Sequence, residues 1–329
     1  MAGSLSRRAL LGSSLAALGL AAPAQAQGYP SKTVTIVVSI GAGTGMDVLA
    51  RLYGDKLSAA LGKPVVVENK PGASTMLAAN YVATSPADGH TLVVLTSSAL
   101  AINPTLYKQI SYDPNKDFIP ISLYVKSPFI LVVNPALPVK SVPELLKYAK
   151  EVNPPLNYAS VGAGGLQHLS MEFTKNRFGL EMTHVPYRNT GQSVTDIAAG
   201  HVALGFVEAG ASIPLINEGK LRALAVSSST RLPLLPDVPP FSEASGAADY
   251  EAVSWHVLLV PAKTPKEIVD RLHSEMQTIM TAPDMKEKAS NIGLIPITPP
   301  SVAETSKYIE SEQAKWGALV EKLGLKGTQ

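Results

Sequence analysis

Two glycine-rich turns carry the clearest chemical signal in the sequence. The first, Gly41-Ala-Gly-Thr-Gly-Met46, follows an apolar, β-branched run at residues 33–40 and precedes a helical pattern. A turn of this kind exposes backbone N–H groups at a helix N-terminus, where they attract anions. Met46 stands where a dinucleotide-binding motif needs its third glycine, so the turn predicts an anion site without a nucleotide. Asp47 follows directly and is expected to be a helix cap or a ligand contact.

A second turn has the same construction. Ser160-Val-Gly-Ala-Gly-Gly165 leads through Leu166-Gln-His168 into another helical pattern. One such turn alone would be a weak signal. Two of them, each in its own half of the chain, would place anion-binding backbone on both walls of a cleft.

Signatures of catalysis are missing from the sequence. It has no Gly-x-Ser-x-Gly or His-Glu-x-x-His motif, no two of its six histidines are three or four residues apart, and it has no cysteine. From the sequence we therefore expect a protein that is not an enzyme and that has neither a metal site nor a cofactor. His168 is more typical of a hydrogen-bonding residue at a helix start than of a base. Glu208 ends an apolar run at 202–207, where ligands bind in open α/β sheets, although a solvated loop acid explains it equally well.

Strands and helices must position these turns, and their patterns alternate along the chain. Residues that match a capping box at Ser141/Glu144, Thr264/Glu267 and Ser301/Glu304 predict helix starts. The alternation predicts mostly parallel sheets flanked by helices. Further strands are expected at residues 65–67, 91–96, 129–133, 182–185, 202–207, 221–226 and 253–260.

Proline-rich passages near residues 126–128 and 232–254 indicate where the chain crosses between two domains. We expect a first domain made of residues 27–127 and 253–329 and a second made of residues 128–252. A ligand would lie in the cleft between them.

The charge distribution separates a basic N-terminal segment from a remainder with no net charge. Arg7 and Arg8 account for the excess of 28 Lys+Arg over 26 Asp+Glu, and a neutral remainder excludes a nucleic-acid binder. The two arginines precede an uncharged stretch at 9–22 and an Ala24-Gln-Ala26 cleavage pattern, which together predict a signal peptide at residues 1–26. Export through the Sec or the twin-arginine route would leave a mature chain that begins at Gln27.

Short blocks along the whole mature chain carry a family resemblance. The chain resembles the periplasmic substrate-binding proteins of tripartite tricarboxylate transporters, also called the Bug family, through the order and spacing of these blocks. They are Tyr29-Pro30 and residues 47–51, 64–73, 86–89, 103–107, 157–160, 167–169, 185–188, 237–239 and 261–265.

The resemblance implies a two-domain α/β periplasmic-binding-protein (Venus flytrap) fold that closes on a small organic carboxylate. It also implies delivery of that ligand to the membrane components of a transporter in the periplasm. Signalling to a sensor kinase is the alternative, and a periplasmic hydrolase on the same architecture is a third option. Carried over by position, the ligand-binding residues are Thr44, Gly45, Met46 and Asp47 on one wall, and Ser160, Gly162, Ala163, Gly164, Gly165 and His168 on the other. Ser97, Ser98 and Glu208 are candidates for the distal part of the ligand.

The first turn departs from the family pattern at two positions. Thr44 stands where relatives commonly have a glycine, and Met46 replaces a hydroxyl residue before Asp47. Because Met46 offers a pliable apolar surface, we expect a ligand with some apolar or aromatic body. Glu208 would repel a second carboxylate and would favour an amine or a hydroxyl.

Overall fold

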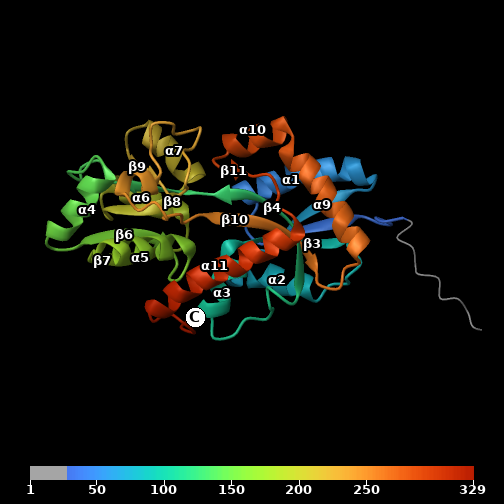
Figure 1. The fold of residues 1–329 in the computed structure, drawn as a ribbon. Coiled ribbons are helices and arrows are strands. Elements are labelled where there is room, and N and C mark those ends of the chain that lie inside the picture. Colours follow the sequence, from blue (N-terminus) through green and yellow to red (C-terminus); the bar gives the residue numbers. More distant parts are fainter. Residues whose placement is uncertain (1–27) are drawn as a thin grey trace, which may run out of the picture.

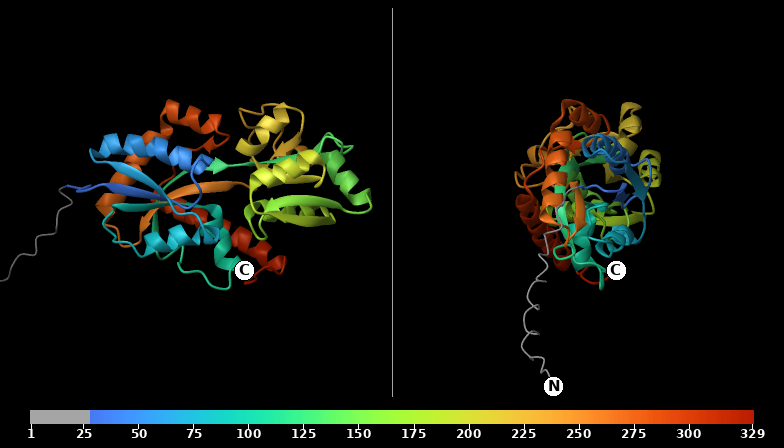
Figure 2. Two further views of the ribbon diagram at one scale, coloured as in Figure 1. Left: turned by 180° about the vertical axis from the view of Figure 1, so that it is seen from behind. Right: turned by 90° about the vertical axis from the view of Figure 1, so that its right-hand side faces the viewer.

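A computed structural model describes residues 28–329 as two α/β lobes, each built around one β-sheet (Figures 1 and 2). The expected signal peptide lies outside the described residues. The first sheet has the order β11-β4-β10-β3-β1-β2 and the second β7-β6-β8-β5-β9. The expected two-sheet α/β architecture is therefore confirmed.

The first lobe contains both ends of the described chain. Its strands are β1 (Val34–Val38), β2 (Val65–Asn69), β3 (Thr91–Thr96), β4 (Phe118–Ser127), β10 (Ser254–Pro261) and β11 (Ile295–Pro296). Its helices are α1 (Gly45–Leu61), α2 (Met76–Ala83), α3 (Asn103–Leu106), α9 (Lys266–Thr281), α10 (Pro283–Asn291) and α11 (Val302–Lys322), with short helical turns at Ala73–Thr75 and Ser98–Ile102.

The second lobe is formed by the middle of the chain. Its strands are β5 (Phe129–Val133), β6 (Leu156–Val161), β7 (Met182–Tyr187), β8 (Leu204–Glu208) and β9 (Arg222–Val226). Its helices are α4 (Val142–Glu151), α5 (Leu166–Phe178), α6 (Thr190–Ala199), α7 (Ala209–Asn217) and α8 (Phe241–Ser245).

Both sheets are mixed, where the sequence pattern suggested mostly parallel ones. β1 pairs in parallel with β2 and β3, and β6 pairs in parallel with β7 and β8. The strands β4, β5, β9, β10 and β11 add antiparallel pairs. A strand that helices cover on both faces is apolar throughout whichever way it runs, so the apolar runs did not reveal its direction.

Alternate residues of β1 show how the first sheet is buried on both faces. Ile36 and Val38 join an apolar cluster with residues of α1 and α9, while Val37 faces a second cluster with residues of α2 and α11. The second cluster continues through β5 and α5 into the second lobe. The two lobes therefore share part of their apolar core.

The chain crosses between the lobes at two adjacent strands. β4 ends at Ser127 and β5 begins at Phe129, and the return strand β10 pairs with β4 through Ser254 and Ser127. Figure 1 shows β10 and the β4–β5 segment side by side between the lobes. The domain limits given above remain our prediction.

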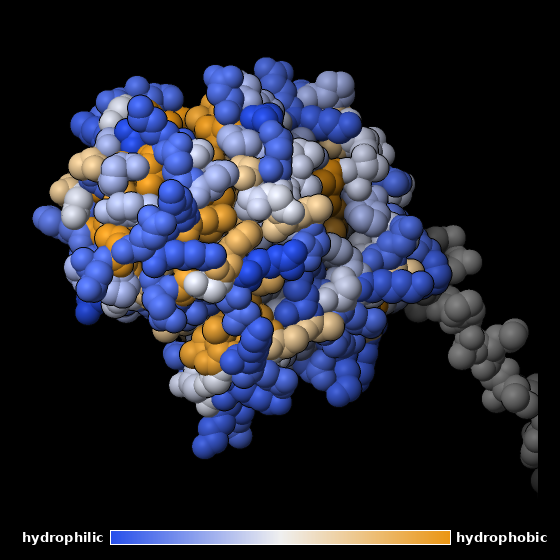
Figure 3. All heavy atoms as spheres, turned by 60° about the vertical axis from the view of Figure 1, so that its left-hand side comes forward, coloured by the Kyte–Doolittle hydropathy of each residue, from blue (hydrophilic) through white to orange (hydrophobic). Residues whose placement is uncertain are grey.

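Apolar side chains also reach the surface. Figure 3, turned so that the second lobe comes forward, shows apolar side chains interspersed with hydrophilic ones. The large apolar side chains that are exposed within residues 28–329 are Val66, Leu77, Tyr81 and Leu234. None of the helices described is long and apolar enough to span a membrane.

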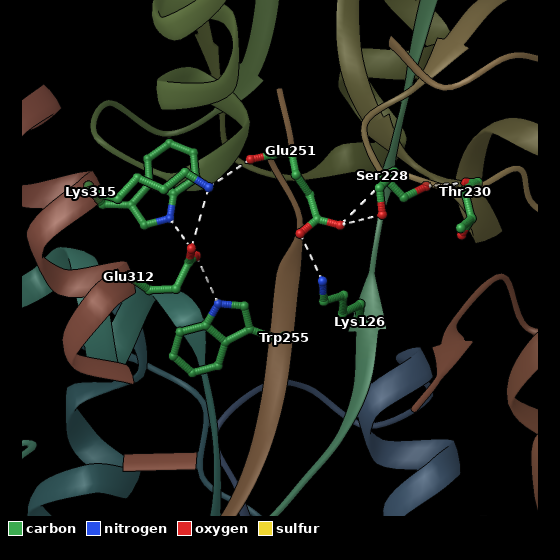
Figure 4. Close-up of polar contacts among 9 residues, drawn as sticks. Lys126, Ser228, Thr230, Glu251, Trp255, Glu312 and Lys315 are labelled. Atoms are coloured by element: carbon green, nitrogen blue, oxygen red, sulfur yellow. Dashed lines mark hydrogen bonds and ion pairs between the residues drawn. The ribbon is translucent and has the colours of Figure 1, made fainter. Parts of the chain in front are cut away.

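A polar network ties the crossing strands together (Figure 4). Glu251 lies just before β10 and accepts from Lys126 Nζ of β4 at 2.8 Å and from Ser229 Oγ of the second lobe at 3.1 Å. The backbone oxygen of Glu251 accepts from Lys315 Nζ of α11 at 2.8 Å. Burial alone would raise the pKa of Glu251, but the bonds from Lys126 and Ser229 hold the pKa below its ordinary value. An ionised Glu251 thus links both crossing strands, α11 and the second lobe.

Candidate ligand-binding cleft

A cavity of about 340 Å³ lies between the two lobes and is lined by both. Its walls include residues at or just after the carboxyl ends of β1, β3, β6 and β8, the position where open α/β sheets bind ligands. The first lobe contributes Ile40, Thr44, Gly45, Met46, Ser74, Thr75, Thr96, Ser98, Asn103, Leu106, Tyr107, Ser127, Ser254, His256 and Leu294. The second contributes Phe129, Val161, Gly162, Ala163, Gly164, Gly165, Leu166, Gln167 and Glu208.

The first wall is the N-terminus of α1. Thr44 is the N-cap residue, and its Oγ1 donates to the Gly41 oxygen at 2.9 Å and accepts from Asp47 N at 3.4 Å. No acceptor among residues 28–329 is bonded to the N–H groups of Gly45 and Met46, which follow the cap and border the cavity. These groups sit at the positive end of the dipole of a 17-residue helix, so they favour an anion.

Asp47 lies behind this wall and does not line the cavity. Its carboxylate accepts from the Gly43 N–H at 2.9 Å, from Arg51 at 2.9 and 3.2 Å, and from Asn69 Nδ2 at 2.9 Å. Burial alone would raise the pKa of Asp47, but these bonds outweigh it and lower the pKa. Asp47 therefore fixes the shape of the turn in its ionised form, and direct contact with a ligand stays a prediction.

The second wall is the turn that leads into α5. Gly162 and Gly164 have φ values of +80° and +78°, which glycine adopts without strain. Their N–H groups donate to the Tyr187 oxygen at 3.1 Å and to His168 Nδ1 at 3.0 Å. Among the described residues no bond uses the N–H groups of Ala163 and Gly165. The amides open to a ligand here are thus those of Ala163, Gly165 and the first turn of α5.

His168 supports this turn from behind. Its ring stacks on His184 with centroids 4.1 Å apart, and His184 Nε2 lies 2.7 Å from Ser160 Oγ. Burial, together with the neighbouring His184, lowers the pKa of His168 to about 4. A neutral ring accepts the Gly164 N–H through Nδ1 and carries its proton on Nε2. Neither His168 nor Ser160 lines the cavity, so their contact with a ligand stays a prediction.

The distal candidates lie at two depths. Ser98 lines the cavity, whereas Ser97 is fully buried and its Oγ lies 3.2 Å from Ser254 Oγ. Glu208 ends β8 and lines the cavity, where solvent in the cleft reaches it. Protein atoms nevertheless surround its carboxyl, and this loss of bulk water raises the pKa of Glu208. The sequence could not decide between a ligand contact and a solvated loop acid, and the structure places Glu208 in the cleft.

Several lining residues were not expected from the sequence. Ser74 and Thr75 have φ values of +49° and +74°, and Asn103 Nδ2 donates to the Ser74 oxygen at 2.9 Å. His256 of β10 is buried with no partner for Nδ1 in the described chain, and burial lowers its pKa to about 4. Gln167 Oε1 accepts from Val161 N at 3.0 Å. In the sequence these residues were marked only by their position near the end of a strand or within a block shared with the family. Such a position is too general to single out residues that line the cavity.

The described residues hold no group of three or more His, Asp or Glu side chains that could bind a metal ion. The polar groups that border the cavity are backbone amides, hydroxyls, the side-chain amides of Asn103 and Gln167, one neutral histidine and one acid. Two lobes around such a cavity define a two-lobed protein that binds a small solute in its cleft.

Comparisons with known proteins identify the family. Residues 49–325 match the model of the tripartite tricarboxylate transporter family receptor, TctC. The chain therefore belongs to this family of solute-binding receptors, as the resemblance implied. Protein BugT of Bordetella pertussis (strain Tohama I) is 32% identical over 321 residues, which cover 97% of this chain and 97% of BugT.

Solved structures share the two-lobed fold. Rpa4515 of R. palustris, solved with adipate, is 35% identical with a TM-score of 0.79, and the match covers 90% of this chain and 98% of that one. MatC (Rpa3494) from Rhodopseudomonas palustris, solved with bound malate, is 29% identical with a TM-score of 0.74, covering 89% and 100%. The expected binding-protein fold is thereby confirmed.

Proposed function

We propose that this protein captures a small organic carboxylate in the interdomain cleft and delivers it to the membrane components of a tripartite tricarboxylate-type transporter. The observation that carries the proposal is the presence of two glycine-rich turns, one from each lobe, on a single cavity. Each turn ends at a helix N-terminus with N–H groups that have no acceptor within the described chain.

Binding follows from the chemistry of these walls. One oxygen of a carboxylate can accept hydrogen bonds from the N–H groups at the start of α1. Its other oxygen can accept them from the N–H groups at the start of α5. Bonds to a charged acceptor contribute about 1.5–3 kcal/mol each, and both helix dipoles favour the negative charge. Because the two sets of donors belong to different lobes, a bound carboxylate stabilises the closed arrangement of the lobes.

The relatives support the same ligand class. Adipate and malate, the molecules in the two solved structures, are both small carboxylates. The basic, apolar and Ala-x-Ala pattern at residues 1–26 supports export, so we place the mature protein in the periplasm. Transport, and not turnover, is proposed because the cleft presents binding groups without an activated nucleophile.

The decisive experiment removes one amide and leaves the fold intact. Proline is tolerated at the first position of a helix, and Thr44 already has the extended backbone (φ −73°, ψ 160°) that a following proline requires. Gly45→Pro thus deletes an N–H that makes no bond within residues 28–329. Gly45→Ala is the matched control, because it keeps the N–H and its Cβ would meet Leu294 at an ordinary 3.8 Å.

A thermal-shift panel of carboxylates first selects the tightest ligand, and calorimetry then measures its affinity. We expect Gly45→Pro to weaken binding by about 10–100-fold, the equivalent of one charge-assisted bond, and Gly45→Ala to stay within a few-fold of the parent. Equal affinity in the two variants, with both folded by circular dichroism, would show that the carboxylate is not bound at this helix.

A further inference from the structure

Glu208 is the acidic residue of the cavity wall, and its carboxylate has no partner. No residue of the described chain bonds or pairs with its side chain, and none of the residues that line the cavity is a lysine or an arginine. Loss of bulk water around its carboxyl raises the pKa of Glu208. A carboxylate that faces the cavity without a counter-charge is free to pair with a positive group of a ligand.

The position of Glu208 is set by rigid elements. It pairs with Phe129 across the antiparallel β5–β8 ladder and directly precedes α7. Its backbone oxygen accepts from Ser212 Oγ in the first turn of α7 at 2.9 Å, while its side chain does not cap that helix. The backbone is therefore held on both sides, and the carboxylate is left for the cavity.

The cleft thus offers two opposite electrostatic ends. The amides of the two glycine-rich turns favour a negative group, and Glu208 favours a positive one. His256 does not offset the acid, because burial keeps its ring neutral at ordinary pH. A ligand with two carboxylates would place its second charge in a cavity that already holds an unpaired acid.

We propose that the cleft selects a zwitterion, a carboxylate that also carries an ammonium group, and that Glu208 binds the ammonium. This inference rests on the proposed function, because the ligand carboxylate is assigned to the turns. Glu208 is then the residue that sets specificity against dicarboxylates, which lack the cation and add a repulsive charge.

Calorimetry at pH 7.5 on length-matched probes tests the proposal. The probes are an ω-amino acid, the plain monocarboxylate and the dicarboxylate at chain lengths of four, five and six carbons. We expect the best ω-amino acid to bind at least tenfold more tightly than both partners of its length. Glu208→Gln keeps the shape of the side chain and removes its charge. It should weaken the affinity for the ω-amino acid at least tenfold and change the affinity for the monocarboxylate by less than threefold.

Glu218→Gln is the matched control, because Glu218 follows the other end of α7 and is paired with Lys220 at the surface. It should change neither affinity. A dicarboxylate that binds most tightly at every length, or an amino acid whose affinity Glu208→Gln leaves unchanged, would overturn the zwitterion and leave the carboxylate carrier standing. Failure of all nine probes and of every carboxylate in the thermal-shift panel to bind would overturn the carboxylate carrier itself.

A second measurement does not depend on the choice of probes. The protein is purified with no ligand added and is then denatured. Any small molecule that copurified with it is released and identified by mass spectrometry. We expect a molecule that has both a carboxyl group and a basic nitrogen. A released carboxylate without basic nitrogen would overturn the zwitterion, and a molecule without a carboxyl group would overturn the proposed function.

Discussion

Gly293 of the first lobe lies against Ala209 of the second, so closely that a Cβ on Gly293 would be 2.5 Å from the Ala209 Cβ. Gly293 lies between α10 and β11, and Ala209 begins α7, next to Glu208. A similar contact occurs across the cleft, where a Cβ on Gly164 would be 2.5 Å from Leu106. The lobes therefore touch at two places where one side of the contact is a glycine.

Gly293→Ala is expected to hold the lobes apart. Its φ of +79° strains any other residue, and its Cβ has no room against Ala209. Gly246→Ala is the matched control, because its φ of +74° imposes the same strain while no atom lies within 4 Å of the new Cβ. Both variants should lose about 1–2 kcal/mol of stability from the backbone.

Small-angle scattering and calorimetry separate the two variants. Gly293→Ala should increase the radius of gyration of the ligand-saturated protein and weaken carboxylate binding by tenfold or more. Gly246→Ala should match the parent in both measurements. If both variants scatter and bind alike, the Gly293–Ala209 contact is not part of closure.

The bond from Gly164 N–H to His168 Nδ1 predicts a pH dependence of stability. Burial lowers the pKa of His168 to about 4, whereas an unfolded histidine titrates near 6.5. As pH falls through about 6.5, His168 takes up a proton in the unfolded chain. In the folded chain His168 stays neutral until about pH 4. The free energy of unfolding should therefore decrease across this window by an amount of order 1–3 kcal/mol from His168.

A variant isolates this contribution from other titrating groups. His256 acts in the same direction, and Glu208, whose pKa is raised by burial, acts in the opposite one. His168→Asn retains an acceptor for the Gly164 N–H and cannot take up a proton. Urea unfolding at pH 7.5, 6.0 and 5.0 should give a smaller loss of stability for His168→Asn than for the parent. Parallel curves would contradict the role given to His168.

The turns could be predicted from the sequence because their chemistry is local. Glycine spacing after an apolar run specifies a strand-to-helix turn, and Gly43, Gly162 and Gly164 do adopt positive φ there. Glu208 could be noticed for the same reason, as an acid at the end of a strand. Its lack of a partner could not be inferred, because that depends on every residue packed around the cavity.

The remaining lining depends on contacts between distant segments. His256 reaches the cavity because β10 returns from the second lobe and pairs with β3 opposite Thr96. Asn103 is oriented by its bond to the Ser74 oxygen, 29 residues away. Neither pairing leaves a pattern in the surrounding sequence, and the antiparallel direction of β10 was itself not predicted.

Thr75 is expected to be a strained residue whose side chain serves the cleft. It has φ 74° and ψ −5°, and it follows two further residues with positive φ, Ala73 and Ser74. A β-branched residue in this conformation costs about 1–2 kcal/mol, and such strain persists mainly at binding sites. Because glycine adopts the conformation freely but gains entropy when unfolded, Thr75→Gly should stabilise the fold by about 0.5–1 kcal/mol.

The same variant should bind less tightly, because Thr75 lines the cavity and glycine removes its hydroxyl and methyl groups. We expect a loss of several-fold for the tightest carboxylate of the panel, with stability measured by urea unfolding. Thr84→Gly is the control: Thr84 has a right-handed backbone (φ −96°, ψ 0°) at the end of α2 and lies outside the cavity. It should lower stability and leave affinity unchanged. If Thr75→Gly also lowers stability, the left-handed turn at residues 73–75 is not strained. If Thr75→Gly raises stability and leaves affinity unchanged, the strain at Thr75 serves no contact with the ligand.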